Sequence, residues 1–463
     1  MKRFQSVAGL LALALIFAGC NGVSNSSSST TQNSKAQVFT TGEDAPVSSV
    51  VAFNITINSI TLNNGSTTAQ VLSTPTSIDF GRLVGLRSLL GFNTVAPGTY
   101  TSATFTFAAS NPAPSINYVD LTTNPPSIGT ATGNLSNPTV TVSFPTSAPL
   151  VVGSNGLAGL HMDFDLRQSL AMDGSGNLVI NNGQIAITPV LDVMAVSASD
   201  DLGQITEFTG NIVSVNTAGN SFVMQGPFGF QETIDVNTNT LYNGSNTLGS
   251  LIVNGIVAVE GTVQADGSIL ASGVELITTD KAFISGRILA VSPGAIVTIF
   301  VGEELGTSAT IPVDRVYTVD LSQVSQYDIC FIDNWFTNEL FSASSLVVGQ
   351  RIFVGGVYQS NAFTPDMVSL RRQGVVGSLV TNSVNITSGN LGSYQMQNDA
   401  LMSYSAGGPF TVYTGAKTVF VNINGLTGLQ AAGATNLISR GLVFYDPNTN
   451  KPIVWAGRVR VLP

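Results

Sequence analysis

The segment Leu160-His-Met-Asp-Phe-Asp-Leu166 holds the densest group of side chains that could do chemistry. Alternation along a β-strand would place His161, Asp163 and Asp165 on one face. Same-face neighbours on a strand lie ~7 Å apart, which suits a Ca²⁺ site or the ~5–9.5 Å carboxylate pairs of glycosidases. The alternative, which the pattern favours, is a solvated face opposite a buried one formed by Leu160, Met162, Phe164 and Leu166.

Other catalytic signals are absent from the sequence. His161 is the only histidine, so a metal site built from several histidines is excluded, and a Ser-His-Asp centre would depend on this one residue. The chain has no Gly-x-Ser-x-Gly, no His-Glu-x-x-His and no phosphate-binding loop ending in Gly-Lys-Ser/Thr. The sequence therefore predicts no catalytic residue, no cofactor and a non-enzymatic protein.

Three aromatic residues offer a different kind of site. Trp335, Phe336 and Phe341 fall in an insertion near residues 328–344. Flat apolar rings with polar edges stack on sugar rings or insert into a partner protein, which makes these residues candidate ligand contacts. The alternative, which we favour, is that they cap a hydrophobic core.

Composition limits the classes of partner. The chain has 17 basic and 27 acidic residues and a formal net charge of −10, and after the N-terminal pair Lys2-Arg3 only Arg371 and Arg372 are adjacent basic residues. Because a protein that follows phosphates needs clustered Lys and Arg, nucleic acid is excluded as a partner. With 43% hydrophobic and 10% charged residues, the chain has enough apolar material for several cores.

The apolar pattern indicates an all-β protein. Residues 37–198 alternate with a period of two between turn signals such as Pro97-Gly98, which predicts a β-sandwich. The apolar phase switches between Ile57 and Ile60, as at a β-bulge or at a bend from one sheet to another. Leucines at helical spacing predict one short helix from Arg82 to Leu90.

The rest of the chain contains three divergent copies of one unit, at residues 205–279, 280–373 and 374–463. Each opens on a glycine followed by apolar residues, at Gly210, Gly286 and Gly377. A second shared segment ends at Gly261 and Gly356, and its third counterpart is aligned so that Pro447 replaces the glycine. Five or six strands in each copy predict small β-barrels, whose closure removes exposed strand edges.

The N-terminus carries a targeting signal. Lys2 and Arg3 precede a short apolar run that ends in Leu15-Ile-Phe-Ala-Gly-Cys20, and residues 1–19 resemble a bacterial lipoprotein signal peptide. The resemblance implies cleavage before Cys20, acylation of Cys20 and anchoring to a membrane by its acyl chains. Serine-rich residues 20–36 are expected to form a tether. Cys330 would then lack an intramolecular disulfide partner and is expected to be buried.

Two families are similar to the remaining chain. Residues 37–196 resemble domain-of-unknown-function family 4382 through Asp44-Ala-Pro-Val47, Pro97-Gly-Thr-Tyr100 and Met162-Asp-Phe-Asp-Leu166. The copies from residue 205 onward resemble domain-of-unknown-function family 5666, through a Gly-x-Val opening and a Val-x-Val-x-Gly strand. Both resemblances imply an architecture and a cell-envelope setting, and neither assigns a catalytic residue.

These features lead to three functional hypotheses. The first is a lipid-anchored, non-catalytic scaffold or an adhesion and glycan-binding module, with a polysaccharide or an envelope protein as partner. The second is a polysaccharide-acting enzyme that uses Asp163 and Asp165, and the third is an accessory lipoprotein of an envelope assembly complex. Asn21 after Cys20, in place of Asp, favours the outer membrane.

Overall fold

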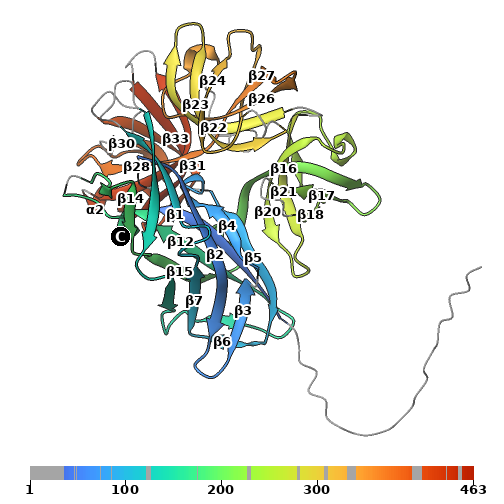
Figure 1. The fold of residues 1–463 in the computed structure, drawn as a ribbon, viewed down its shortest axis with the longest axis vertical. Coiled ribbons are helices and arrows are strands. Elements are labelled where there is room, and N and C mark those ends of the chain that lie inside the picture. Colours follow the sequence, from blue (N-terminus) through green and yellow to red (C-terminus); the bar gives the residue numbers. More distant parts are fainter. Residues whose placement is uncertain are drawn as a thin grey trace, which may run out of the picture. The chain divides into compact units, whose positions relative to one another are not determined.

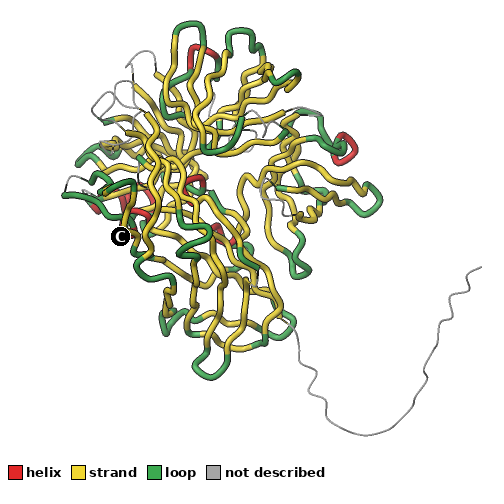
Figure 2. The backbone as a smooth tube through the Cα atoms, in the orientation of Figure 1, coloured by secondary structure: helices red, strands yellow, loops and turns green. Residues whose placement is uncertain are grey.

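The computed structural model describes residues 36–462 apart from residues 46, 48, 73, 85, 121–126, 175, 227–230, 279–281, 307–310, 331–339, 399–408, 434 and 447–450. Strands dominate the described chain (Figure 2), which confirms the predicted all-β class. The helical segments are short, and none of those described is long and apolar enough to cross a membrane.

The N-terminal part forms a β-sandwich (Figure 1). One sheet has the order β15-β12-β1-β5, the other has the order β10-β7-β2-β8-β9-β14-β13 with β3 and β4 also paired to β2, and β6 pairs with β11. The elements are β1 (Ala36–Ala45), β2 (Val50–Asn63), β3 (Thr68–Leu72), β4 (Thr76–Asp79), η1 (Phe80–Arg82), β5 (Ser88–Val95), β6 (Gly98–Tyr100), β7 (Ser102–Phe107), β8 (Ser115–Asp120), β9 (Ser127–Leu135), β10 (Thr139–Ser143), β11 (Leu150–Val152), β12 (Leu157–Asp165), α1 (Leu166–Ser169), β13 (Ile180–Asn181), β14 (Gln184–Ile187), β15 (Leu191–Val196) and η2 (Asp201–Gly203).

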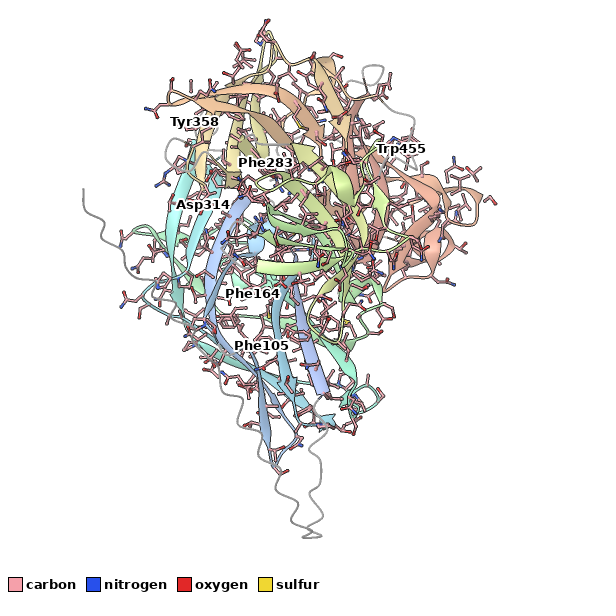
Figure 3. The ribbon with its side chains drawn as sticks, turned by 90° about the vertical axis from the view of Figure 1, so that its right-hand side faces the viewer. Phe105, Phe164, Phe283, Asp314, Tyr358 and Trp455 are labelled. Carbon is pink, nitrogen blue, oxygen red and sulfur yellow. The ribbon has the colours of Figure 1, made fainter. Side chains whose placement is uncertain are left out.

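Aromatic rings join the two layers of the sandwich. Phe164 on β12 lies 5.2 Å from the ring of Phe53 on β2 and 5.6 Å from that of Phe107 on β7, and it lies with Phe105 inside this part of the chain (Figure 3). On β7 the buried residues alternate with half-buried ones, which agrees with the predicted period of two. A register shift between Ile57 and Ser59 on β2 confirms the predicted bulge.

The predicted helix from Arg82 to Leu90 is wrong. Among the described residues of this stretch, a 3₁₀ turn is formed at Phe80–Arg82 alone, and Leu90 belongs to β5, which pairs with β1. The leucines at helical spacing are nevertheless all buried in the sandwich core. Pairing of β5 with β1 satisfies the backbone there and overrides the local helical pattern.

Three six-stranded sheets follow, which we call the first, second and third repeats. The first contains β16 (Gln204–Asn216), β17 (Ser221–Gln225), β18 (Gln231–Asp235), β19 (Leu241–Tyr242), η3 (Leu248–Ser250), β20 (Ile256–Val263) and β21 (Ile269–Thr278). The second contains β22 (Ala282–Ser292), β23 (Ile296–Leu305), β24 (Arg315–Asp320), β25 (Gln326–Ile329), η5 (Ala343–Ser345), β26 (Arg351–Gln359) and β27 (Ala362–Leu370). The third contains β28 (Gln373–Leu379), β29 (Asn385–Ser388), β30 (Leu391–Asn398), β31 (Phe410–Val421), α2 (Gly425–Ala432), β32 (Asn436–Asp446) and β33 (Lys451–Val461).

Strand pairing closes two of these sheets. A β18–β21 pairing closes the first repeat and a β28–β30 pairing closes the third. The second repeat has the order β24-β23-β22-β26-β27-β25, with no pairing between the described residues of its edge strands β24 and β25. The sandwich followed by three barrel-like repeats is therefore the predicted fold class.

Each repeat has an opening glycine at an equivalent register position and a second glycine at an equivalent bulge. In each repeat, the opening glycine pairs with a residue on a neighbouring strand, and a second glycine follows that residue four positions later. The pairs are Gly210 with Val257, Gly286 with Ile352 and Gly377 with Leu437. Register shifts then occur at Gly261, Gly356 and Gly441. The structural counterpart in the third repeat is thus Gly441, so the alignment that placed Pro447 there is wrong.

Gly441 tests the role of these bulges. A Cβ at this position would collide with the carbonyl oxygen of Trp455, a backbone atom that cannot move aside. We expect Gly441→Ala to lower the free energy of unfolding by about 1–3 kcal/mol, the usual cost of overpacking. Urea unfolding followed by circular dichroism measures this change.

Gly302→Ala is the matched control, because an added Cβ there meets nothing within 4 Å. Its effect should stay within about 0.5 kcal/mol. Equal losses in the two variants would contradict the assignment of Gly441 to a crowded bulge.

Candidate functional site

The predicted site on β12 lies at an interface between parts of the chain. His161 is 0% exposed and Asp163 is 1% exposed, so the expectation of a solvated strand face is wrong. The Asp163 carboxylate accepts a hydrogen bond from Arg460 on β33 of the third repeat. β12 is a central strand, and on the face that the sandwich core leaves open Asp163 meets the third repeat, while Phe39 of the neighbouring β1 packs in the core of the first repeat.

Two hydrogen bonds in series hold the His161 ring in place. The Thr41 hydroxyl donates its only proton to the carbonyl oxygen of Leu202 at 2.9 Å. The contact of 3.1 Å between Thr41 Oγ1 and His161 Nδ1 must therefore be donated by Nδ1–H. His161 is thus held by structural partners in the interface.

Asp165 has a different, local role from Asp163. Its carboxylate accepts hydrogen bonds from the backbone N–H and the side-chain amide of Gln168, at 3.0 and 2.7 Å, and caps the short helix α1. Within the described ranges, no group of three or more His, Cys, Asp or Glu side chains is arranged to hold a metal ion. The two carboxylates therefore have separate partners.

Of the aromatic candidates, only Phe341 can be placed. It is 7% exposed and packs in the core of the second repeat, 5.7 Å from the ring of Tyr327. Trp335, Phe336 and Cys20 lie outside the described residues. Cys330 is buried in the same core as Phe341.

Most arginines of the chain gather where the sandwich and the repeats meet. We call this group and its carboxylates the junction cluster. Its arginines, eight of the twelve in the sequence, are Arg82, Arg87, Arg351, Arg371, Arg372, Arg440, Arg458 and Arg460, and its acids are Asp163, Asp201, Glu207, Glu260, Glu275 and Glu303. Arg82, Asp201, Glu260 and Arg351 are partly exposed, and the other charged side chains are almost completely buried.

Glu207 is the centre of the cluster. The register of β16 shifts between Ile205 and Phe208, and Glu207 in this bulge has a left-handed φ of +52°. The bulge turns its carboxylate out of the sheet pattern and toward arginines of the second repeat and of its connection to the third. Glu207 pairs with Arg351, with Arg371 at 3.5 Å and with Arg372 at 4.0 Å.

Arg371 and Arg372 follow β27 directly and connect the second repeat to the third. Arg371 Nη1 donates to both carboxylate oxygens of Glu275 on β21, at 2.8 and 2.9 Å. Its guanidinium also stacks 4.0 Å above the ring of Phe353. Arg372 pairs with Glu260 on β20, so both arginines bind the first repeat.

The sandwich joins the cluster through its linker and through Arg87. The Arg87 guanidinium contacts Asp201 at 3.4 Å, and its Nε donates to the carbonyl oxygen of Gln204 at 3.0 Å. Arg458 of the third repeat reaches the same Asp201 at 3.0 Å. Arg82 of η1 pairs at 3.4 Å with Glu303 of the second repeat. Ion pairs therefore connect all four parts of the fold.

Burial and pairing act oppositely on the acids of the cluster. Burial alone would raise the pKa of Glu207, but the charges of Arg351, Arg371 and Arg372 outweigh it and lower that pKa to about 2. Burial raises the pKa of Glu275 and of Glu303, although a neighbouring arginine opposes the rise in each case. Glu207 is thus the carboxylate whose negative charge the surroundings favour most.

Sequence reasoning identified Asp163 as unusual but missed the cluster. The only local sign was the adjacent pair Arg371-Arg372 in a chain that has few basic residues. Their partners Glu207, Glu260 and Glu275 lie far away in the sequence. No spacing rule links them.

Glu207→Gln tests the centre of the cluster. The substitution keeps the size of the side chain but leaves buried arginines without their anionic partner, which typically costs about 3–5 kcal/mol. We expect a loss of this size at pH 7 in urea unfolding. The exposed-carboxylate control Asp320→Asn should change stability by less than about 1 kcal/mol, and a small loss in Glu207→Gln would contradict the assignment.

The stability difference between wild type and Glu207→Gln should depend on pH. Because the folded-state pKa of Glu207 is lowered to about 2, its contribution is fully present above the unfolded pKa of about 4.3. This stabilising contribution is lost as the pH falls from about 4.3 through the folded-state pKa of about 2. The stability difference between wild type and Glu207→Gln should therefore be constant from pH 5 to 8 and shrink below pH 4, whereas a difference independent of pH would contradict the pairing.

Comparison with known proteins shows that one part of the chain is similar to a known family. Residues 35–182 match the family described as "Domain of unknown function (DUF4382)". The match ends just before β14, so the strands β14 and β15 that complete both sheets lie beyond it. No curated protein matches the chain. The sandwich region through residue 182 thus carries the similarity to DUF4382.

Proposed function

We propose that this protein is a non-catalytic, lipid-anchored scaffold of the cell envelope, which holds its sandwich and repeats in one fixed arrangement and presents them to a polysaccharide or an envelope protein. The junction cluster is the observation that carries this proposal. Buried charges that become unpaired when modules separate carry a large free-energy cost, so they are not expected between modules that move independently.

Apolar contacts between the parts support the same proposal. Phe283 and Phe353 of the second repeat meet edge to face at 4.7 Å within a small core that also includes Ile256 of the first repeat. Leu442 of the third repeat packs in the core of the second. Inter-domain contacts that are both apolar and charge-paired disfavour relative motion.

A polar contact strengthens the link between the second and third repeats. Gln350 is fully buried, and its amide donates to the carbonyl oxygens of Ser345 and of Val443, both at 2.9 Å. Its amide oxygen accepts from the N–H of Val347 at 2.7 Å. One side chain therefore ties the connection before β26 to β32.

The envelope setting rests on the N-terminal sequence. The lipoprotein-like signal ending at Cys20, the serine-rich tether and the resemblance of the repeats to domain-of-unknown-function family 5666 support it. The recurring bulge glycines agree with that resemblance, because each repeat keeps the same pairing register. Asn21 supports the outer membrane as the location.

Cell fractionation tests the anchor. We expect the wild type in the membrane fraction and Cys20→Ala in the soluble fraction, because the acyl chains provide the attachment. Protease treatment of intact cells then locates the folded part, and digestion without lysis would support presentation at the surface. Cys20→Ala that remains in the membrane fraction would contradict the lipid anchor.

A further inference from the structure

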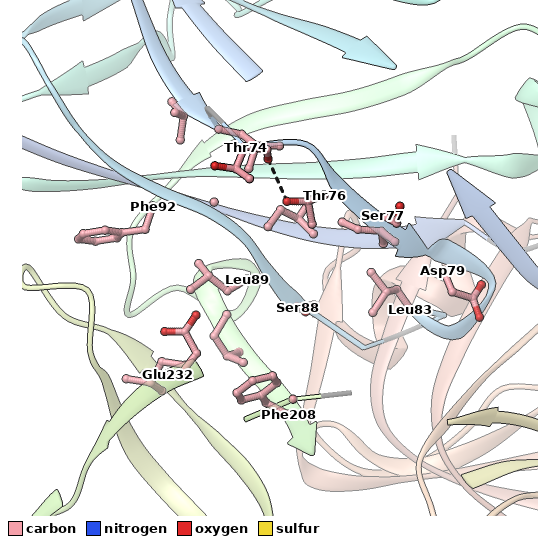
Figure 4. Close-up of a pocket in the computed structure, with 18 of the residues that line it drawn as sticks. Thr74, Thr76, Ser77, Asp79, Leu83, Ser88, Leu89, Phe92, Phe208 and Glu232 are labelled. Carbon is pink, nitrogen blue, oxygen red and sulfur yellow. Dashed lines mark hydrogen bonds between the residues drawn. The ribbon is translucent and has the colours of Figure 1, made fainter. Parts of the chain in front are cut away.

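A cavity of about 310 Å³ opens between the sandwich and the first repeat (Figure 4). Apolar side chains form most of its wall: Leu72, Leu83, Leu89 and Phe92 from the sandwich, and Phe208 and Ile269 from the first repeat. The volume lies at the lower end of the range of small-molecule sites. Both its size and its apolar wall fit a small organic molecule.

Two carboxyl groups interrupt this apolar wall. The carboxylate of Glu232 on β18 has no hydrogen bond or ion pair with any described residue, and it points toward Leu89 across the cavity (Figure 4). Asp79, at the end of β4, is only 5% exposed. Its Oδ1 accepts the N–H of Phe53 at 2.8 Å, while Oδ2 has no hydrogen-bond partner in the described structure.

The empty cavity is a poor place for these negative charges. Burial raises the pKa of Glu232 to about 7 and, with a smaller contribution from Asp314, raises that of Asp79 to about 6. A buried carboxylate is stabilised when a cation pairs with it. The cavity also contains Arg82, but its guanidinium is paired with Glu303 at 3.4 Å.

We propose that this cavity binds a small amphipathic amine, with the apolar body between Leu89 and Phe208 and the ammonium group on the Glu232 carboxylate. The apolar wall accounts for the body of the ligand, and the Glu232 carboxylate, which has no partner among the described residues, accounts for its charge. An anionic ligand would face two carboxyl groups, and a sugar would leave the apolar wall unused. The inference does not depend on the envelope location.

Calorimetric titration with two probes of equal chain length tests the proposal. Octylamine carries the ammonium group, and octanol has the same apolar body without a charge. At pH 8, we expect octylamine to bind wild type about tenfold or more tightly than octanol, as a charge-assisted hydrogen bond provides. Glu232→Gln should remove this preference and leave octanol binding unchanged.

Two further variants control for indirect effects. Asp320→Asn removes an exposed carboxylate elsewhere and should bind both probes as wild type does. Ser88→Leu adds an apolar side chain within the cavity and should weaken both probes. Thermal unfolding of each variant verifies that it is folded.

The pH dependence of binding gives an independent readout. Because protonated Glu232 cannot pair with an ammonium group, octylamine affinity should fall as the pH drops from 8 to 5.5, whereas octanol affinity should not. Equal affinities of wild type for octylamine and octanol would overturn the proposal. An amine preference that persists in Glu232→Gln would overturn the role of Glu232.

Discussion

The pairing of Glu207 with arginines of the second repeat and of its connection to the third is the interaction on which the arrangement of this fold depends. Glu207 and Arg371 are almost completely removed from water, and isolated charges in such surroundings are costly. Each charge is tolerated only while its partner is in place. Separation of the repeats would expose the whole group to water or leave single charges buried, so the cluster favours one docked arrangement.

Charge pairing of this kind contributes more to specificity than to net stability. The desolvation cost of a buried ion pair commonly offsets its Coulomb attraction. The apolar contacts, such as Phe283 against Phe353 and Leu442 in the core of the second repeat, provide the attraction between the parts. The junction cluster then determines which of the possible apolar contacts is formed.

Local pattern was sufficient to predict the class of the fold. Alternation predicted the strand β7, the phase switch predicted the bulge near Ser59, and the glycines at Gly210, Gly286 and Gly377 indicated the repeats. The prediction failed where long-range pairing decides the outcome. Leu90 fits a helical spacing but pairs with β1, and the register of β32 identifies Gly441 as the bulge residue.

The site was less predictable than the fold, and the reason is physical. The alternation around Asp163 correctly separated two strand faces, but it could not show that a second domain covers the polar one. Arg460 and Asp163 lie 297 positions apart. The cavity between Leu89 and Phe208 likewise exists only after the sandwich and the first repeat have docked.

A distance measurement by electron spin resonance would test the central claim most directly. Spin labels at Leu241→Cys in the first repeat and Leu391→Cys in the third occupy exposed positions, while the native Cys330 is buried. A fixed arrangement predicts one narrow distance distribution that broadens when Glu207 is replaced by glutamine. A broad distribution in the otherwise unmodified protein would show that the repeats move independently and would contradict the account.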